Sequence, residues 1–116
     1  MLIFKIFLAD QWTTLRQAGS TDGAPIDIAD GYVHFSTAAQ VEETAAKYFA
    51  GAEGLMLVAV DATAAGEALK WEPSRGGALF PHLYRRMTME DVVWAQPLPI
   101  LDGCHQFPAG LEEAGQ

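Results

Sequence analysis

Apolar and polar positions follow one another along the chain in a pattern that predicts short strands separated by two helices. Dense apolar runs at 2–8 and 55–60 are typical of buried strands, and further strands are expected at 32–36, 68–72, 80–84 and 92–98. The run at 55–60 contains no polar residue, which predicts a central strand. Pro97 and Pro99 place the last strand at a sheet edge, because proline has no N–H to donate to a neighbouring strand.

Two helices are predicted from apolar residues that recur at helical spacing. For the first, Asp10 is the expected N-cap and Gly19 the expected end. The second opens with a capping-box pattern from Thr37 to Gln40 and runs to about Phe49. These helices alternate with the strands, which favours an α+β fold.

The segments between these elements are rich in turn-forming residues. Within 20–30, the alternation of Ile26 and Ile28 predicts a loop with a short extended piece. Residues 61–67 are expected to form a loop or a single helical turn, and 88–90 a short helical turn.

The length of 116 residues suits one domain, and half of the residues are hydrophobic, enough for a core. We assign an α+β domain to residues 1–108 and a flexible acidic tail to 109–116. Seven Lys plus Arg against fifteen Asp plus Glu give a net charge of -8, which disfavours nucleic acid and acidic membranes as partners. A small anionic ligand can still bind where one or two cations are focused.

Targeting and cysteine signals are few. Cys104 is the only cysteine, so an intrachain disulfide cannot form, and the Cys and His spacing is not that of a zinc site. The apolar start lacks a basic region and a small-residue cleavage site, so it is predicted to be a strand rather than a signal peptide. No run reaches the length of a membrane span, and the expectation is a soluble cytoplasmic protein.

Two of the three histidines lie in apolar, aromatic surroundings, where an imidazole needs a hydrogen-bond partner. His34 has Ser36 two positions on, and His82 has Tyr84. Residues two apart in a strand share a face, so these four side chains predict a pocket built by two strands. The alternative is a pair of core histidines that bond backbone carbonyls, with Ser36 as a helix cap.

Two further segments carry candidate ligand groups. Ser36 and Thr37 precede the second helix, whose N-terminal amides attract anions, although capping alone would also select hydroxyl residues there. In 71–77, a glutamate beside a tryptophan precedes an arginine and glycines, which combines an acid, a cation and close backbone approach. The alternative is a surface turn with an exposed ion pair. The candidates in this segment are Trp71, Glu72, Arg75 and Gly76.

Three other positions have simpler interpretations. In 80–84, Phe80 and Leu83 are expected to face the core, and His82 and Tyr84 the opposite side. Lys5 is a lone cation in an apolar strand, and we expect its ammonium to extend to solvent at the sheet edge. The alternative is a pocket lysine that acts as a ligand group. His105 lies near the acidic end and is expected to be exposed.

The chain resembles a bacterial family known as domain of unknown function nine-five-two. The resemblance covers residues 3–107 and is carried by 4–6 (Phe-Lys-Ile), 30–37 (Asp-Gly-Tyr-Val-His-Phe-Ser-Thr), 71–73 (Trp-Glu-Pro) and 79–84 (Leu-Phe-Pro-His-Leu-Tyr). It implies a fold similar to that of ADP-ribosyltransferases, a split mixed or antiparallel sheet that binds NAD in a central cleft. Lys5 stands where many relatives carry a histidine, and Ala78 where many carry an acidic residue.

The resemblance implies a nucleotide ligand, NAD or ADP-ribose, with NAD as the substrate. A metal is not expected, because the residue spacing is not that of a metal site. His34, Glu72 and His82 are then the catalytic candidates, with Glu72 as the carboxylate beside an oxocarbenium-like state. The ligand-binding candidates are Lys5, Ser36, Thr37, Trp71, Arg75, Gly76 and Tyr84.

Three functions remain open from the sequence. One is ADP-ribosyltransferase-like or NAD glycohydrolase-like catalysis. Another is a non-catalytic module that binds a small metabolite or a protein partner. Metal-dependent hydrolysis by His34, His82 and Glu72 is the least favoured, because their spacing is not characteristic of a metal site. The oligomeric state does not follow from the sequence.

Overall fold

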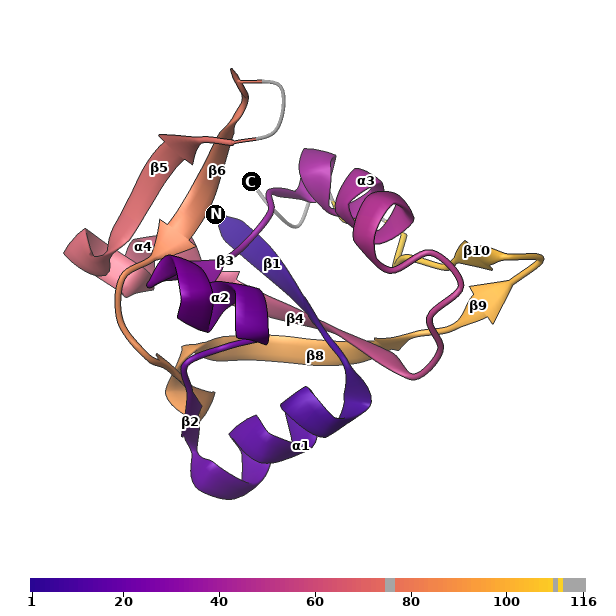
Figure 1. Ribbon diagram of the computed structural model, residues 1–116, viewed down its shortest axis with the longest axis horizontal. Coiled ribbons are helices and arrows are strands. Elements are labelled where there is room, and N and C mark those ends of the chain that lie inside the picture. The colour runs from indigo at the N-terminus through magenta and orange to yellow at the C-terminus, as the bar shows by residue number, and fades with distance from the viewer. Residues whose placement is uncertain (75–76, 110, 112–116) are drawn as a thin grey trace.

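The computed structural model describes residues 1–74, 77–109 and 111, and it has an α+β architecture (Figure 1). The helices are α1 (Ala9–Ala18), α2 (Pro25–Asp30), α3 (Ala38–Tyr48) and α4 (Ala62–Ala65), and 3-10 turns lie at Gly66–Ala68 and Met89–Asp91. The strands are β1 (Leu2–Phe7), β2 (Ser20–Thr21), β3 (Val33–His34), β4 (Leu55–Asp61), β5 (Leu69–Pro73), β6 (Leu79–Leu83), β7 (Met87–Thr88), β8 (Val92–Leu98), β9 (Ile100–Leu101) and β10 (Cys104–His105). Every pairing of these strands is antiparallel.

The larger sheet has the order β1-β4-β8, and β4 lies at its centre as its uninterrupted apolar sequence predicts. Leu57, Val58 and Ala59 are all fully buried, because both faces of this sheet are covered. Val58 packs with Ile3 and Phe7 in one hydrophobic cluster, whereas Leu57 and Ala59 belong to another. The prediction that β8 forms an edge is also confirmed.

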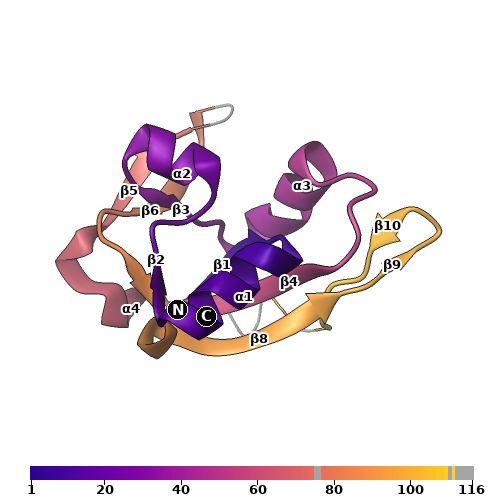
Figure 2. The same cartoon turned by 60° about the horizontal axis from the view of Figure 1, so that its bottom comes forward.

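The second sheet has the order β3-β6-β5 and is joined to the first by one isolated bridge. Phe4 of β1 and Ser36, which follows β3, exchange backbone hydrogen bonds of 2.8 Å in both directions. Figure 2 shows β3, β5, β6 and α2 gathered at one end of the molecule and the β9–β10 hairpin at the other. The bridge therefore places the end of β3, which carries His34, directly beside β1, while β6 with His82 pairs with β3.

Helix α3 matches its prediction closely, and α1 differs at its start. The backbone N–H of Thr37 donates to Oε1 of Gln40 at 3.0 Å, which is the N-terminal half of the expected capping box. Helix α1 begins at Ala9 with Leu8 as its N-cap, so the prediction that Asp10 is the cap is wrong. Asp10 instead lies in the first turn, where a negative charge interacts favourably with the helix dipole.

The short helix α2 replaces the extended piece predicted within 20–30. Pro25 occupies the first helical position, where its missing N–H costs nothing, and Gly31 ends the helix with a φ of 87°. Ile26 and Ile28 are 60% and 63% exposed, so their alternation does not mark a buried strand face. Asp27 between them is the residue that turns inward.

The C-terminal tail is described only in part. Ala109 and Leu111 belong to the described residues, and the Leu111 side chain is buried in the cluster that contains Phe4 and Val41. Residues 110 and 112–116 lie outside them. His105, which was expected to be exposed, is partly buried and its Nε2 bonds the Ala52 carbonyl at 2.8 Å.

Candidate functional site

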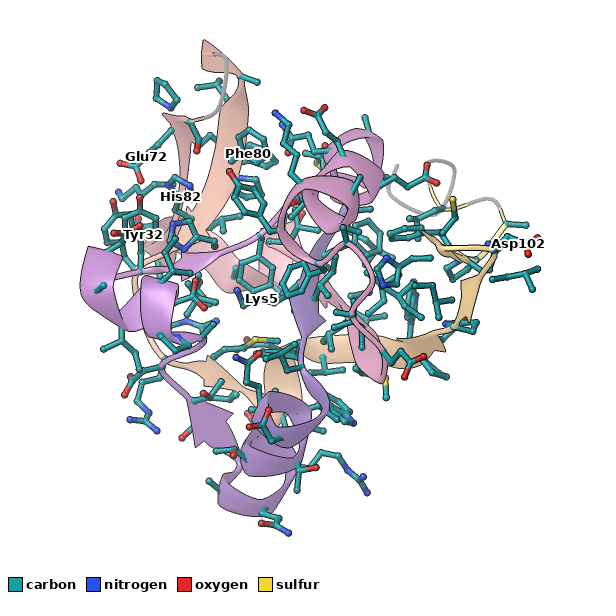
Figure 3. The ribbon with its side chains drawn as sticks, turned by 45° about the vertical axis from the view of Figure 1, so that its right-hand side comes forward. Lys5, Tyr32, Glu72, Phe80, His82 and Asp102 are labelled. Carbon is teal, nitrogen blue, oxygen red and sulfur yellow. The ribbon has the colours of Figure 1, made fainter. Side chains whose placement is uncertain are left out.

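Two histidines face each other across the neighbouring strands β3 and β6. His34 and His82 are direct partners in this ladder, and their ring centroids lie 5.2 Å apart. The ring of Tyr32 stacks on that of His82 with 4.2 Å between centroids and lies 4.6 Å from that of His34. Figure 3 shows Tyr32 beside His82 and Glu72. The antiparallel pairing thus brings together the two histidines that the sequence singled out.

A buried carboxylate, that of Asp27 in α2, holds the backbone and ring of His34. Its Oδ1 accepts from the backbone N–H of His34 at 3.0 Å and lies 2.6 Å from Nδ1 of the same residue. Its Oδ2 accepts from the backbone N–H of Ala24 at 2.6 Å, which closes the first turn of α2. One carboxylate therefore joins the start of α2 to β3.

Lys5 of β1 completes this cluster as the cation that pairs with Asp27. Its ammonium lies 2.9 Å from Oδ2 of Asp27 and donates to the carbonyl of His34 at 3.0 Å. The side chain of Lys5 is only 7% exposed, so the prediction that its ammonium reaches solvent at the sheet edge is wrong. A buried charge needs a partner of opposite sign, and here that partner comes from a helix the sequence pattern did not predict.

Burial and charge act in opposite directions on the carboxylate of Asp27. Burial alone would raise its pKa, but the hydrogen bond from His34 and the charge of Lys5 outweigh this effect and lower the pKa to about 2. Burial lowers the pKa of Lys5, and Asp27 offsets part of that change. At neutral pH Asp27 is therefore ionised and only accepts hydrogen bonds, so Nδ1 of His34 carries the proton between them.

The second ring nitrogen of His34 also meets a carboxylate. Its Nε2 lies 3.0 Å from Oδ2 of Asp30, the last residue of α2. As an imidazolium the ring donates to both carboxylates, and as a neutral imidazole it donates to one of them. Because both nitrogens are engaged within the protein, His34 anchors α2 to β3.

Glu72 of β5 forms a second histidine–carboxylate pair with His82. Its Oε1 lies 2.8 Å from Nδ1 of His82 and accepts from the hydroxyl of Tyr84 at 2.7 Å. The hydrogen bonds from Tyr84 and His82 lower the pKa of Glu72, and the bond to Glu72 raises the pKa of Tyr84 to about 12. An ionised Glu72 only accepts, so Nδ1 of His82 carries a proton, and in the neutral form of the ring Nε2 is then an acceptor.

A cavity of about 330 Å³ lies at the junction of the two sheets, beneath α2 and α3. Its apolar lining combines phenylalanine rings with aliphatic side chains, and its polar lining includes residues of β1, α2, β3 and β6. The apolar group includes Phe4, Ile6, Phe35, Val41, Phe49 and Phe80, and the polar group includes Lys5, Asp30, Tyr32, His34, Ser36 and His82. The cavity therefore combines flat apolar walls with a few polar groups, as small-molecule sites do.

Phe80 and His82 both line this cavity, so the prediction that they point to opposite sides of their strand is wrong. Residues two apart in a strand share a face, and here both side chains are buried. Ser36 also lines the cavity, and its hydroxyl lies 2.9 Å from that of Thr44 in α3.

The remaining predicted ligand residues lie away from this cavity or outside the described part of the chain. Thr37 caps α3, and Trp71 is 39% exposed on β5. Tyr84 lines a second cavity of about 240 Å³, together with Tyr32 and two arginines that pair with Asp22 and Asp91. Arg75 and Gly76 are not among the described residues.

Sequence reasoning missed Asp27 and Tyr32, the residues that organise the cluster. The signal for Asp27 was local: proline at the first helical position, an acidic residue two positions on and a glycine that ends the helix. Tyr32 was treated only as part of a strand, although it directly precedes the β3 residues that pair with His82 and Leu83. No group of three or more His, Cys, Asp or Glu among the described residues is arranged to hold a metal ion.

Comparison with known proteins identifies the family. The chain belongs to the family described as protein of unknown function (DUF952), whose model matches residues 6–95. It is 45% identical to protein CC0527 from Caulobacter crescentus, whose crystal structure aligns with a TM-score of 0.87 over 91% of this chain and 94% of that one. A solution NMR structure of CC0527 aligns at 43% identity, with a TM-score of 0.81 and 90% of each chain covered.

A crystal structure of a double mutant of CC0527 gives the same values as the unmutated protein, 45% identity and a TM-score of 0.87. No curated protein matches the chain. Among the described residues, no helix is long and apolar enough to cross a membrane.

Proposed function

We propose that this protein binds a small ligand with a flat ring in the cavity at the sheet junction, and that the ligand is NAD or a related nucleotide such as ADP-ribose. The observation that carries the proposal is His82. It lines an aromatic cavity, its ring is oriented by Glu72 and Tyr32, and no hydrogen bond from the described residues engages its Nε2. An oriented imidazole with a spare acceptor is a group that recognises a ligand.

The size of the cavity limits how much of a nucleotide it encloses. Small-molecule sites span about 300–1,000 Å³, so a cavity of about 330 Å³ holds one ring with its ribose. The phosphates and the rest of a dinucleotide then lie outside, past Ile26 of α2 and Tyr48 of α3, which line the cavity and are 60% and 62% exposed.

The arrangement of the sheets supports the same ligand class by resemblance. ADP-ribosyltransferases bind NAD in a cleft between the halves of a split sheet. Here two three-stranded sheets meet at the bridge between Phe4 and Ser36, and the cavity lies at that junction. We propose an ADP-ribosyltransferase-like fold on this basis, with function argued from the cavity, because a fold hosts many activities.

Calorimetric titration with NAD and with ADP-ribose tests the proposal, using two variants of α2 as a matched pair. Ile26→Glu places a negative charge at the cavity, whereas Ile28→Glu makes the same change in net charge at a similarly exposed position that does not line it. We expect Ile26→Glu to weaken binding about tenfold, about 1.4 kcal/mol, and Ile28→Glu to have little effect. Equal losses in both variants, or no binding by the unmutated protein, would refute the proposed site.

A second candidate function is cleavage of the bond between nicotinamide and ribose, and the ionised carboxylate of Glu72 favours it. The C1′–N bond breaks, its electron pair neutralises the pyridinium ring, and water or another acceptor adds to C1′ with loss of a proton. A nearby carboxylate stabilises the oxocarbenium-like state. Glu72 does not itself line the cavity, so in this proposal it acts through the ring of His82, which does.

Release of nicotinamide separates catalysis from binding. We expect Glu72→Gln to abolish release while leaving the affinity for ADP-ribose nearly unchanged, because the carboxylate acts on the transition state. Binding without release by the unmutated protein would instead favour the non-catalytic small-metabolite module. Absence of any nucleotide binding would leave a protein partner as the remaining alternative.

A further inference from the structure

The ammonium of Lys5 has one N–H more than its polar partners in the described structure. It contacts Oδ2 of Asp27 and the carbonyl of His34, whereas an ammonium has three donors. The ring of Phe7 also lies near the ammonium, and the distance from Nζ to the ring centroid is 5.7 Å. This distance is near the outer limit of a cation–π contact. Lys5 is more than nine-tenths buried and lines the cavity, so this wall offers a hydrogen-bond donor.

His82 on β6 needs a hydrogen-bond donor, whereas Lys5 needs an acceptor. With its Nδ1–H bonded to Glu72, the ring in its neutral form has Nε2 as an acceptor, and the side chain is 2% exposed and lines the same cavity. A buried polar atom without a hydrogen-bond partner costs free energy. A well-matched ligand therefore supplies an acceptor for Lys5 and a donor for His82. The cavity therefore favours a ligand that both accepts and donates a hydrogen bond.

The charges around the cavity argue against a negatively charged group. The positive charge of Lys5 is already compensated by Asp27 at 2.9 Å. Asp30 lines the cavity, and Glu72 stands directly behind His82. An anionic group placed on Lys5 would therefore be held by a neutralised cation among further carboxylates, which disfavours its burial.

We infer that the cavity selects a neutral carboxamide, or a ring amide of similar shape, over the corresponding carboxylate. The carbonyl oxygen accepts from Lys5, and the ligand's N–H supplies the donor that Nε2 of His82 requires. A carboxylate has no donor to offer and adds a charge. This inference rests on the proposed function and deepens it, because it names the chemical feature by which the site distinguishes otherwise identical nucleotides.

The sharpest test compares nicotinamide mononucleotide with nicotinic acid mononucleotide by calorimetry on the unmutated protein. The two ligands differ only in carboxamide against carboxylate. We expect the amide to bind about tenfold more tightly or better. Equal affinities, or tighter binding of the acid, would overturn the inference while the proposed function stands. If neither mononucleotide, NAD nor ADP-ribose binds, the proposed function falls and the inference falls with it.

Lys5→Met and Lys47→Met form a matched pair of variants, because each removes one positive charge and keeps a side chain of similar length. Lys47 lies on the surface of α3, paired with Glu43 at 3.2 Å, and does not line the cavity. We expect Lys5→Met to weaken binding of the amide about tenfold and Lys47→Met to leave it unchanged. Unchanged amide binding in folded Lys5→Met would refute the role of Lys5. If that variant does not fold, the ligand pair on the unmutated protein decides.

Discussion

Replacing Asp27 by asparagine should destabilise this protein far more than an ordinary substitution in a short helix. The carboxylate is fully buried and accepts from the backbone N–H groups of Ala24 and His34, from the His34 ring and from Lys5. Asparagine offers one oxygen and a pair of N–H donors, so it leaves at least one donor and the Lys5 charge without a partner. Breaking a buried ion pair in this way costs about 3–5 kcal/mol of unfolding free energy.

The pH dependence gives a second and more specific signature. The pKa of Asp27 is lowered from 3.8 to about 2 in the folded protein, which corresponds to about 2.5 kcal/mol at about 1.36 kcal/mol for each pH unit. Because the folded-state pKa is depressed, this stabilisation is fully present above about pH 4 and is lost as the pH falls toward 2. The stability difference between the unmutated protein and Asp27→Asn should therefore shrink by most of that amount between about pH 4 and 2, and by the rest as the pH falls below 2.

Urea denaturation at several pH values between neutrality and strong acid measures both quantities. Asp22→Asn is the matched control, because Asp22 is 56% exposed and pairs with Arg86 on the surface. We expect that control to cost less than about 1 kcal/mol. A loss below about 1 kcal/mol for Asp27→Asn, or a stability difference that stays constant down to acid pH, would refute the buried ion cluster.

Three other expectations follow from the site and the core. Glu72→Gln should lower the pKa of Tyr84 from about 12 toward 10.0, and an unchanged phenolate absorbance titration would argue against their hydrogen bond. The neutral His82 ring should be protonated at Nδ1, and NMR of its nitrogens would contradict this by showing the other tautomer. Leu57→Ala in the central strand should cost about 2–5 kcal/mol in urea denaturation, whereas Leu101→Ala on the exposed hairpin should change stability by about 0.5 kcal/mol or less.

Elements whose signal is local were predicted from the sequence, and those that depend on partners far along the chain were not. The uninterrupted apolar run of β4 and the capping pattern of α3 contain their own evidence, so both elements were predicted correctly. Lys5 was placed at the solvent edge, because nothing in an apolar strand reveals a carboxylate 22 positions later, at 2.9 Å in the fold (Lys5 to Asp27). The spacing of apolar residues predicts which face of a strand is buried. It does not predict which charged side chain from elsewhere in the chain contacts that face.

The pairing of His34 with His82 also depends on contacts that sequence spacing does not reveal. Sequence spacing predicted that His34 and Ser36 share a pocket, and both line the cavity, but Tyr84 does not line it beside His82. Spacing also does not say which nitrogen of each histidine remains available. In the structure, carboxylates occupy both nitrogens of His34 and only Nδ1 of His82. The two residues look alike in sequence, and the difference between them is set entirely by α2 and β5.

Burying the charges of Lys5 and Asp27 costs free energy, and this cost bears on what the cluster does. Apolar residues of similar volume often stabilise a protein as well as a buried ion pair or better, so packing alone does not account for Lys5 and Asp27 inside the fold. What the ion pair adds is direction: Asp27 fixes α2 to β3 through His34, and Lys5 is held with its ammonium at the cavity wall. A single carboxylate therefore sets both the position of the helix that covers the cavity and the orientation of the cation inside it, which is an arrangement suited to recognising a ligand.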